Sequence, residues 1–250
     1  MFSREAIAAL KAARSVFVLT GAGVSADSGV PTFRGTGGLW RNYQATSLAT
    51  PKAFANNPKL VWEFYSYRRK ILAPLKPNPG HFAIASLEER VSSFTLATQN
   101  IDNLHRIAGS QNIIELHGNI WEVRCSSSTC KNAAEPWENC QVPLSPLPPL
   151  CGDCGGHLRP NVVWFGEMLN PAALSASMRA IQEADFFIVV GTSALVQPAS
   201  RMPLMAHEAG VFVLEINPEP TELSKIVKES VQETSGAALP LLVEEAFAVQ

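Results

Sequence analysis

The sequence predicts an α/β fold, with a doubly wound parallel Rossmann-type sheet and a smaller second domain. Four short apolar runs have the composition of strands that are buried on both faces. These runs are residues 15–20, 93–98, 185–190 and 211–216. Helical periodicity separates them, and strands that alternate with helices pair in parallel. Two stretches without this alternation, residues 36–87 and 121–160, indicate the second domain.

The chain order then gives the domain boundaries. Residues 1–35, 88–120 and 161–250 form the predicted sheet domain. Residues 36–87 hold helical patterns and no obvious strand, and residues 121–160 hold all five cysteines. We expect these two insertions to form the small domain as a helical module and a zinc module. The helical patterns lie near residues 3–13, 59–72, 80–90, 171–183 and 198–208.

Composition restricts the partners. The chain has 250 residues, of which 46% are hydrophobic and 17% charged, with a formal net charge of -2. It has no basic excess for nucleic-acid binding and no apolar run near the roughly 18 residues of a membrane span. The N-terminus "MFSREAIAALKAARS" lacks a signal-peptide core, so we expect an intracellular, non-secreted protein. This segment fits a first surface helix better than a weak presequence, and both the cytoplasm and the mitochondrial matrix stay open.

A glycine loop follows the first predicted strand. Gly21, Ala22 and Gly23 come directly after "SVFVLT". Glycines at this position let backbone N–H groups approach a phosphate. A hydride-transfer Rossmann domain would add a second strand that ends in an acidic residue about 20 positions on. That region is "GTGGLWRNYQ", which fits a nucleotide site of another kind.

Polar residues also follow the later strands. Because the carboxyl ends of parallel strands line the ligand crevice, four such loops together predict a bound dinucleotide. The residues in the three later loops are Gln99, Asn100, Asp102, Gly191, Thr192, Ser193 and Asn217.

The cysteines predict a metal site. Cys125 and Cys130 have four residues between them, and Cys151 and Cys154 form a C-x-x-C pair. An odd, clustered set without a secretion signal favours a metal over disulfides. Three ligand sets are open; we favour the two pairs, with Cys140 as the spare. Four thiolates close the coordination sphere of Zn²⁺, so the metal would be structural.

Five motifs follow one another along the chain: "GAGVSADSGVPTFRG", "TQNIDNLH", "ELHGNIWEVRC", "VVWFGE" and "VVGTS". Together they resemble the sirtuin family of NAD-dependent protein deacylases over residues 15–217. The resemblance implies a Rossmann domain with a helical and a zinc module. It also implies that NAD is consumed as a co-substrate, which accounts for the missing acidic residue.

The resemblance assigns roles to individual residues. It implies that His117 is the base that takes a proton from a ribose hydroxyl, which suits a neutral imidazole at cell pH. Asn100 and Asp102 match residues that hold the ribose and nicotinamide ends of NAD. Phe33 and Arg34 match the loop that covers the dinucleotide. The further implied NAD contacts are Asp27, Ile101 and Ser235.

The same resemblance implies a peptide site after the zinc module. This segment would offer an edge to which an extended acyl-lysine peptide adds as a strand, with broad sequence tolerance. Its residues are Val163, Trp164, Phe165, Gly166 and Glu167.

One arginine indicates the acyl group. Arg68 lies in the apolar stripe of the helix at 59–72, where a guanidinium needs an anion. Tyr65 lies three residues earlier on the same face. The Y-x-x-R pair, with the small Ala49 upstream, resembles the desuccinylase, demalonylase and deglutarylase branch of the sirtuins. The alternative is that Arg68 pairs with a protein carboxylate, Glu63 or Glu167.

The predicted function is therefore removal of succinyl, malonyl and glutaryl groups from protein lysines, with weak deacetylation. The products would be nicotinamide and O-acyl-ADP-ribose. An ordinary NAD-dependent deacetylase and an ADP-ribosyltransferase are the alternatives among enzymes, and a zinc-containing binding module is the alternative without catalysis. We expect a monomer.

Overall fold

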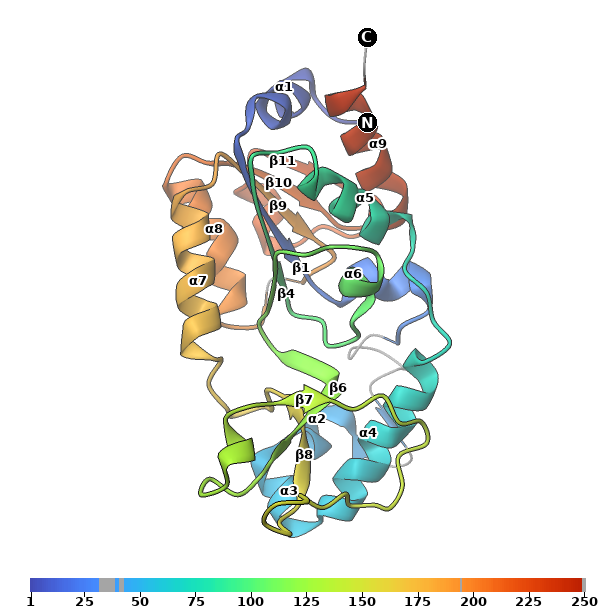
Figure 1. Cartoon of the computed structure of the whole chain (residues 1–250). Coiled ribbons are helices and arrows are strands. Elements are labelled where there is room, and N and C mark those ends of the chain that lie inside the picture. The colour runs from blue at the N-terminus through green and yellow to red at the C-terminus, as the bar shows by residue number, and fades with distance from the viewer. Residues whose placement is uncertain (32–38, 41–42, 194, 249–250) are drawn as a thin grey trace.

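The computed structural model describes residues 1–31, 39–40, 43–193 and 195–248. Its main sheet has six strands, in the order β11-β10-β9-β1-β4-β5, and all neighbours are parallel (Figure 1). The predicted fold class is confirmed. The bounds of the strands are Ser15–Thr20 (β1), Ser93–Thr98 (β4), Ile113–Glu115 (β5), Phe186–Val190 (β9), Phe212–Ile216 (β10) and Glu229–Val231 (β11).

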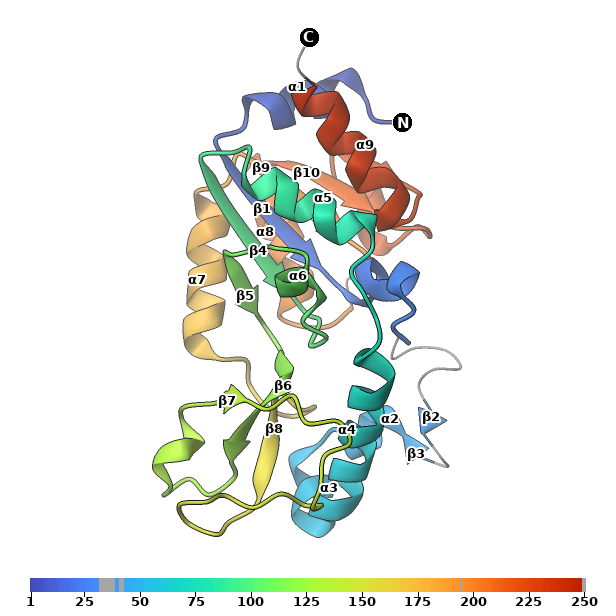
Figure 2. The same ribbon diagram turned by 45° about the vertical axis from the view of Figure 1, so that its right-hand side comes forward.

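Helices cover both faces of this sheet (Figures 1 and 2). Successive side chains of a strand point to opposite faces, so Val16 and Val18 of β1 pack in one core, and Phe17 and Leu19 in the other. The first core is closed by α1 (Arg4–Ala12), α5 (Pro79–Glu88) and α9 (Ser235–Phe247). The second is closed by α7 (Pro171–Gln182) and α8 (Met202–Glu208).

The order of the strands reverses beside β1. The chain passes from β1 to β4 on one side, and later enters β9 on the other. In open α/β sheets, ligands bind at such a switch point, outside the carboxyl ends of the strands. The loops that follow β1 and β9 both lie at this point. The order of the strands therefore predicts where the ligand site is.

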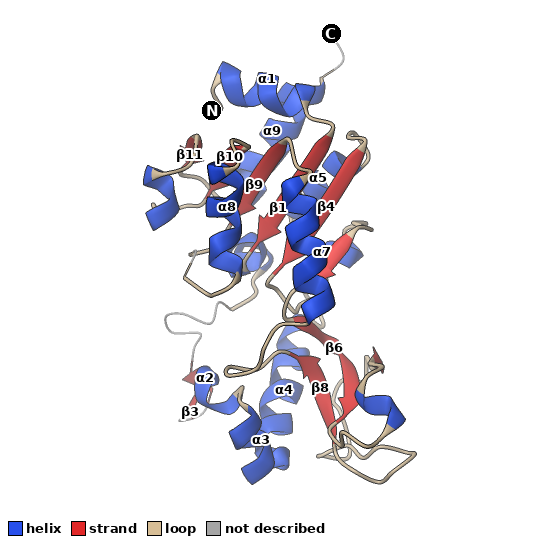
Figure 3. Ribbon diagram, turned by 90° about the vertical axis from the view of Figure 1, so that its left-hand side faces the viewer, coloured by secondary structure: helices blue, strands red, loops and turns tan. Residues whose placement is uncertain are grey.

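The small domain contains the predicted helical and zinc modules. Its helices are α2 (Ala45–Leu48), α3 (Pro51–Asn56) and α4 (Pro58–Leu72). They pack on a three-stranded antiparallel sheet of β7 (Trp137–Glu138), β6 (Gly118–Cys125) and β8 (Leu158–Val162) (Figure 3). A short hairpin, β2 (Leu39–Trp40) with β3 (Tyr43–Gln44), occurs where no strand was expected. Among the described residues, the other short helices are η1 (Ala22–Ser28), α6 (Leu104–Ile107), η3 (Lys131–Ala133), η4 (Ala199–Arg201) and η5 (Glu222–Lys225).

Two domain boundaries differ from those drawn on the sequence. Helix α5 was assigned to the helical module, but its Ala83, Ile84 and Leu87 lie in the core of the main sheet. Strand β6 continues across the boundary drawn between residues 120 and 121. Hydrophobic periodicity identifies the buried face of a helix but not which core it enters, which explains the first difference. Within the described ranges, no helix has both the length and the apolar character needed to cross a membrane.

Candidate active site

Two glycine loops meet at the switch point. The N–H of Gly21 donates to the carbonyl of Val190 at 3.0 Å, and that of Gly23 to the carbonyl of Gly191 at 2.8 Å. A Cβ added at Gly23 would lie 2.7 Å from the Cα of Gly191, closer than real side chains come to backbone. Glycine is therefore required for this approach. The segment after the loop is the 3₁₀ helix η1.

The loop after β4 joins this pair. The backbone N–H of Gln99 donates to the carbonyl of Thr20 at 3.0 Å, and its side-chain Nε2 donates to Oγ1 of Thr192 at 3.1 Å. The predicted residues after β1, β4 and β9 thus form one hydrogen-bonded surface. Asn217 lies after β10, where its N–H donates to the carbonyl of Val231.

His117 lies beside this surface with a defined tautomer. Its Nδ1 is 2.9 Å from the carbonyl oxygen of Gln99. A carbonyl only accepts, so Nδ1 carries the proton and Nε2 keeps its lone pair. Burial lowers the pKa of His117, opposed by the Gln99 carbonyl, so the ring is neutral at cell pH. Gly118 follows with φ +76, and a Cβ there would lie 2.0 Å from the carbonyl oxygen of Asn161.

A buried network centred on Ser25 holds two predicted NAD residues. The Ser25 hydroxyl donates to Oδ2 of Asp102 at 2.8 Å and accepts from Nδ2 of Asn100 at 3.1 Å. Nε2 of His81 lies 3.2 Å from the Ser25 hydroxyl oxygen. Nδ1 of His81 accepts from the backbone N–H of Asn78, so Nε2 is the protonated nitrogen. Burial raises the pKa of Asp102. The bonds to Ser25 fix the orientation of Asn100 and Asp102 before any ligand binds.

Three residues of this site, Ser25, His81 and His105, were not among those predicted from the sequence. His105 approaches Thr20 Oγ1 through Nε2 at 3.0 Å, and its ring centroid is 4.8 Å from that of His81. Burial lowers the pKa of His81 to about 4 and that of His105 to about 3, so both are neutral. Two signals were present: Ser25 lies in the quoted glycine-loop motif, and His81 is the fourth residue of "NPGH", where Asn78 caps α5.

Two more predicted NAD residues lie between η1 and α9. A Cβ at Gly236 would lie 2.8 Å from Oδ2 of Asp27, so this carboxylate lies against the start of α9. The Ser235 hydroxyl donates to the carbonyl of Val24 at 3.3 Å. Both residues therefore lie where η1 contacts the start of α9.

The other predicted NAD residues have separate positions. Ile101 is buried, and its carbonyl accepts from the N–H of Ile120, which ties the site to β6. Ser193 lies in the exposed loop after β9. Phe33 and Arg34 lie outside the described residues.

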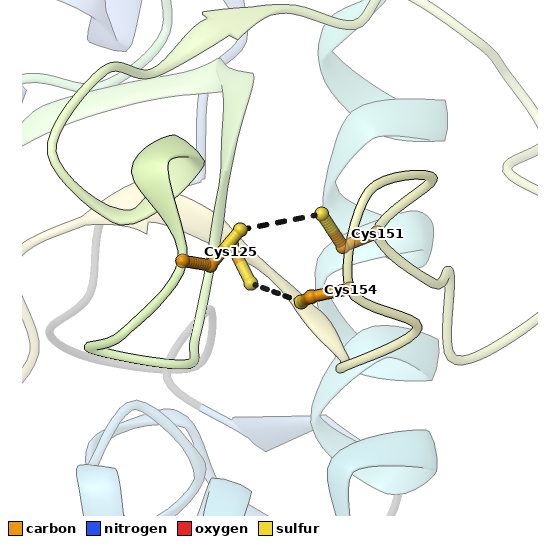
Figure 4. A group of neighbouring side chains, drawn as sticks. Cys125, Cys151 and Cys154 are labelled. Atoms are coloured by element: carbon orange, nitrogen blue, oxygen red, sulfur yellow. Dashed lines mark hydrogen bonds between the residues drawn. The ribbon is translucent and has the colours of Figure 1, made fainter.

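The two cysteine pairs come together in one cluster, of which Figure 4 labels Cys125, Cys151 and Cys154. The Sγ atoms of Cys125, Cys130, Cys151 and Cys154 all lie within 4.8 Å of one another. Two of the sulfur–sulfur distances are 3.5 and 3.9 Å. A tetrahedral zinc with Zn–S bonds near 2.3 Å would separate its sulfurs by about 3.8 Å, so the residues fit the ion. Cys140 is apart from this group, and its thiol donates to Glu138 at 3.1 Å.

The predicted acyl-recognition pair lies on α4. Tyr65 is fully buried, and its hydroxyl oxygen accepts from Nε1 of Trp164 at 2.9 Å. Burial raises the pKa of Tyr65 to about 12, so the hydroxyl keeps its proton. Arg68 is half-buried; burial lowers its pKa, opposed by Tyr65 and Asp102. Ala49 is buried nearby in the same core.

Both carboxylate oxygens of Glu167 are already paired. They accept from Arg159 at 2.6 and 2.8 Å, and one also accepts from the N–H of Trp164 at 2.8 Å. Burial acts against ionisation of Glu167, but the bonds from Arg159 outweigh it and lower the pKa. Of the two proposed protein partners of Arg68, Glu167 is therefore committed to Arg159.

Arg69, which was not predicted to have a role, is the fully buried arginine of α4. Its Nε donates to the carbonyl of Ile120 at 2.8 Å, and Nη1 donates to Oδ1 of Asn139 at 2.6 Å. Its guanidinium carbon lies 5.7 Å from the ring centroids of both Trp62 and Trp121. These contacts tie α4 to β6 and to the loop after β7.

The predicted peptide edge is a loop in this structure. Strand β8 ends at Val162, and a turn forms at Phe165 and Gly166. The N–H groups of Val163 and Phe165 donate to the carbonyls of His117 and Ala49, each at 2.9 Å. A peptide strand would therefore bond to the carbonyl groups of this loop or displace these contacts.

A switch-point crevice joined to a four-cysteine module defines a nucleotide-binding protein with a structural metal centre. The comparisons identify its family. The Sir2 family model matches residues 21–198, and the chain belongs to this family, as the motifs indicated. An NAD-dependent protein deacylase 1 from Caldanaerobacter subterraneus subsp. tengcongensis is 53% identical over 208 residues, covering 83% of this chain and 84% of that protein. An NAD-dependent protein deacylase from Aquifex aeolicus is 49% identical over 225 residues, covering 90% and 92%.

Solved structures agree. A complex of a Sir2 homologue with NAD superposes with a TM-score of 0.92 at 43% identity, covering 98% of this chain and 94% of that chain. A complex of Sir2 with a p53 peptide and NAD⁺ gives a TM-score of 0.85 at 32% identity, covering 98% of both chains.

Proposed function

We propose that this protein is an NAD-dependent lysine deacylase that prefers the acidic succinyl, malonyl and glutaryl groups. The enzyme class follows from membership of the Sir2 family and from relatives that are named NAD-dependent protein deacylases. The acyl preference rests on one observation. Tyr65 and Arg68 share a face of α4, and Tyr65 and Asp102 both act against the effect of burial on the pKa of Arg68, which supports a position of the pair near the predicted NAD residue Asp102.

The residues present fit NAD. The glycine loops at Gly21 and Gly23 lie at the carboxyl edge of the sheet, and Asn100 and Asp102 are both bonded to the Ser25 hydroxyl in η1, the segment after the first loop. When bound, NAD supplies a ribose whose anomeric carbon accepts the acyl oxygen as nicotinamide leaves.

His117 supplies the base. Its Nδ1–H is held by the Gln99 carbonyl, so the Nε2 lone pair is the available acceptor for a proton from a ribose hydroxyl. The half-buried ring is neutral and needs no prior loss of a proton at cell pH. An acyl group transferred to the ribose in this way leaves as O-acyl-ADP-ribose.

The acidic acyl group would be recognised by charge. A guanidinium offers parallel N–H donors to a carboxylate, and the Tyr65 hydroxyl can add a third hydrogen bond. A succinyl carboxylate gives Arg68 a partner of opposite charge, which an acetyl group cannot. Such partly buried contacts are worth about 3 kcal/mol, so we expect a preference of about 10² in kcat/KM.

Substitution of the pair tests this proposal. We expect Arg68→Met to lose most desuccinylation while deacetylation stays level or rises, and Tyr65→Phe to lower the succinyl-to-acetyl ratio in the same direction. The measurement is kcat/KM on one peptide carrying each acyl group. Glu63 is the other carboxylate considered as a partner of Arg68, so Glu63→Gln is the control. This variant should keep the succinyl-to-acetyl ratio of the wild-type enzyme. An unchanged ratio in both Arg68→Met and Tyr65→Phe would mean an ordinary deacetylase.

The peptide is proposed to bind in extended form along residues 163–167. This segment follows directly from β8 and is bonded to His117 through Val163. A related Sir2 structure holds a p53 peptide with NAD⁺. Backbone pairing gives affinity with little sequence discrimination, so we propose a broad range of protein substrates.

A further inference from the structure

The side chain of Trp164 reaches α4. Its indole Nε1 donates to the hydroxyl oxygen of Tyr65 at 2.9 Å. The two side chains are only 2% and 1% exposed. The segment proposed to bind the peptide is therefore directly bonded to the pair proposed to read the acyl group.

This bond constrains the hydroxyl hydrogen of Tyr65. Nε1 of Trp164 is the donor of this bond, so the Tyr65 hydrogen cannot point at it and must point away from Trp164. Because burial raises the pKa of Tyr65 to about 12, the hydrogen is retained. The hydroxyl is thus a directed donor, whose remaining bond is made away from Trp164.

The indole is itself held in place. The guanidinium carbon of Arg159 lies 3.6 Å from the ring centroid of Trp164, and the Phe54 ring is 5.1 Å from it, centroid to centroid. Arg159 is fixed by two bonds to Glu167 and a third, at 2.9 Å, to the carbonyl of Val162. Glu167 in turn accepts from the backbone N–H of Trp164. The ring therefore has little freedom to tilt away from Tyr65.

We infer that Trp164 is a positioning residue for acidic acyl groups: its indole N–H directs the Tyr65 hydroxyl as a hydrogen-bond donor towards the acyl carboxylate. This inference rests on the proposed function. The role of Trp164 in this inference belongs to its side chain. It is separate from the proposed pairing of the peptide with the backbone of residues 163–167.

The test removes the indole N–H and keeps an aromatic ring. Trp164→Phe is assayed on one peptide carrying either a succinyl group or a neutral butyryl group, which has the same carbon chain length. Effects on peptide binding are common to both substrates and cancel in the ratio of kcat/KM values. We expect the succinyl-to-butyryl ratio to fall about tenfold, the scale of one lost charge-assisted hydrogen bond.

A double-mutant cycle separates positioning from packing. In a Tyr65→Phe background there is no hydroxyl to direct, so Trp164→Phe should leave the ratio unchanged. Trp62→Phe is the matched control, because it removes another buried indole N–H in the same core, one bonded to the Leu158 carbonyl at 2.7 Å. It should keep the wild-type ratio. If Trp164→Phe folds poorly, 3-benzothienylalanine at position 164 replaces only the N–H by sulfur.

The outcomes distinguish the two claims. A normal ratio in Trp164→Phe, with a reduced ratio in Tyr65→Phe, overturns the inference and leaves the proposed function standing. An equal fall in both backgrounds also overturns it, because Trp164 would then act by packing. A wild-type enzyme without a succinyl preference overturns the proposed function and the inference together.

Discussion

Arg68 and Arg69 are neighbours on α4 with different surroundings. Arg69 is fully buried and bonded to Ile120 and Asn139, whereas Arg68 is half-buried beside Tyr65. Both lie on the apolar face of the helix, since Arg69 is eight residues after Val61. Hydrophobic periodicity places both arginines on this face. It cannot show which of them is bonded to other residues of the protein and which is available for a ligand. The structural arginine became identifiable only once β6 and the loop after β7 were in place.

Substitution of His117 should lower turnover without unfolding the protein. We expect His117→Ala to bind NAD and to lose at least two orders of magnitude in turnover, the usual scale for a general base. The measurements are NAD titration by calorimetry and steady-state kcat. His157→Ala, an exposed histidine of the zinc module, is the control.

The pH dependence follows from the same residue. Burial lowers the pKa of His117, so the neutral, active form persists to lower pH than for a free histidine. Activity should rise as the pH rises through this pKa, with a midpoint below about 6.5, and stay level above it. Near-normal turnover by His117→Ala would contradict the assignment of His117 as the general base.

At the scale of elements, the four cysteines hold the end of β6 against the loop that precedes β8. Cys125 ends β6, and Cys151 and Cys154 lie in the loop before β8. We expect one zinc per chain, retained in Cys140→Ser and lost in Cys151→Ser together with folding of the small domain. Metal analysis and circular dichroism of both variants check this. Zinc loss in Cys140→Ser would show that the ligand set is different.

Length and periodicity decided which elements could be predicted. The four buried strands of the main sheet were predicted within one residue at each end, because each is a continuous apolar run between polar loops. Strands β5 and β11 have three residues each and carry too little pattern. Helix α9 was missed because it contains Pro240 and is apolar on most sides, which removes the usual signals of an amphipathic helix.

At the scale of the molecule, parallel topology explains why so much of the site was predictable. Residues after β1, β4 and β9 meet because parallel strands end at one edge, so Gly23, Gln99 and Thr192 could be grouped without a structure. Ser25 and His81 meet through the packing of η1 against α5. That contact depends on which core α5 enters, which the sequence pattern leaves open.

The central claim is that this member of the Sir2 family consumes NAD to remove acidic acyl groups from lysine. Its most direct test is mass spectrometry of the products formed from one peptide carrying acetyl-, malonyl- or succinyl-lysine, each with NAD. We expect nicotinamide, free lysine peptide and O-acyl-ADP-ribose, formed about 10² faster from the succinyl than from the acetyl peptide at limiting substrate. Equal or faster turnover of the acetyl peptide would contradict the acyl preference, and ADP-ribosylated protein without O-acyl-ADP-ribose would contradict the deacylase activity itself.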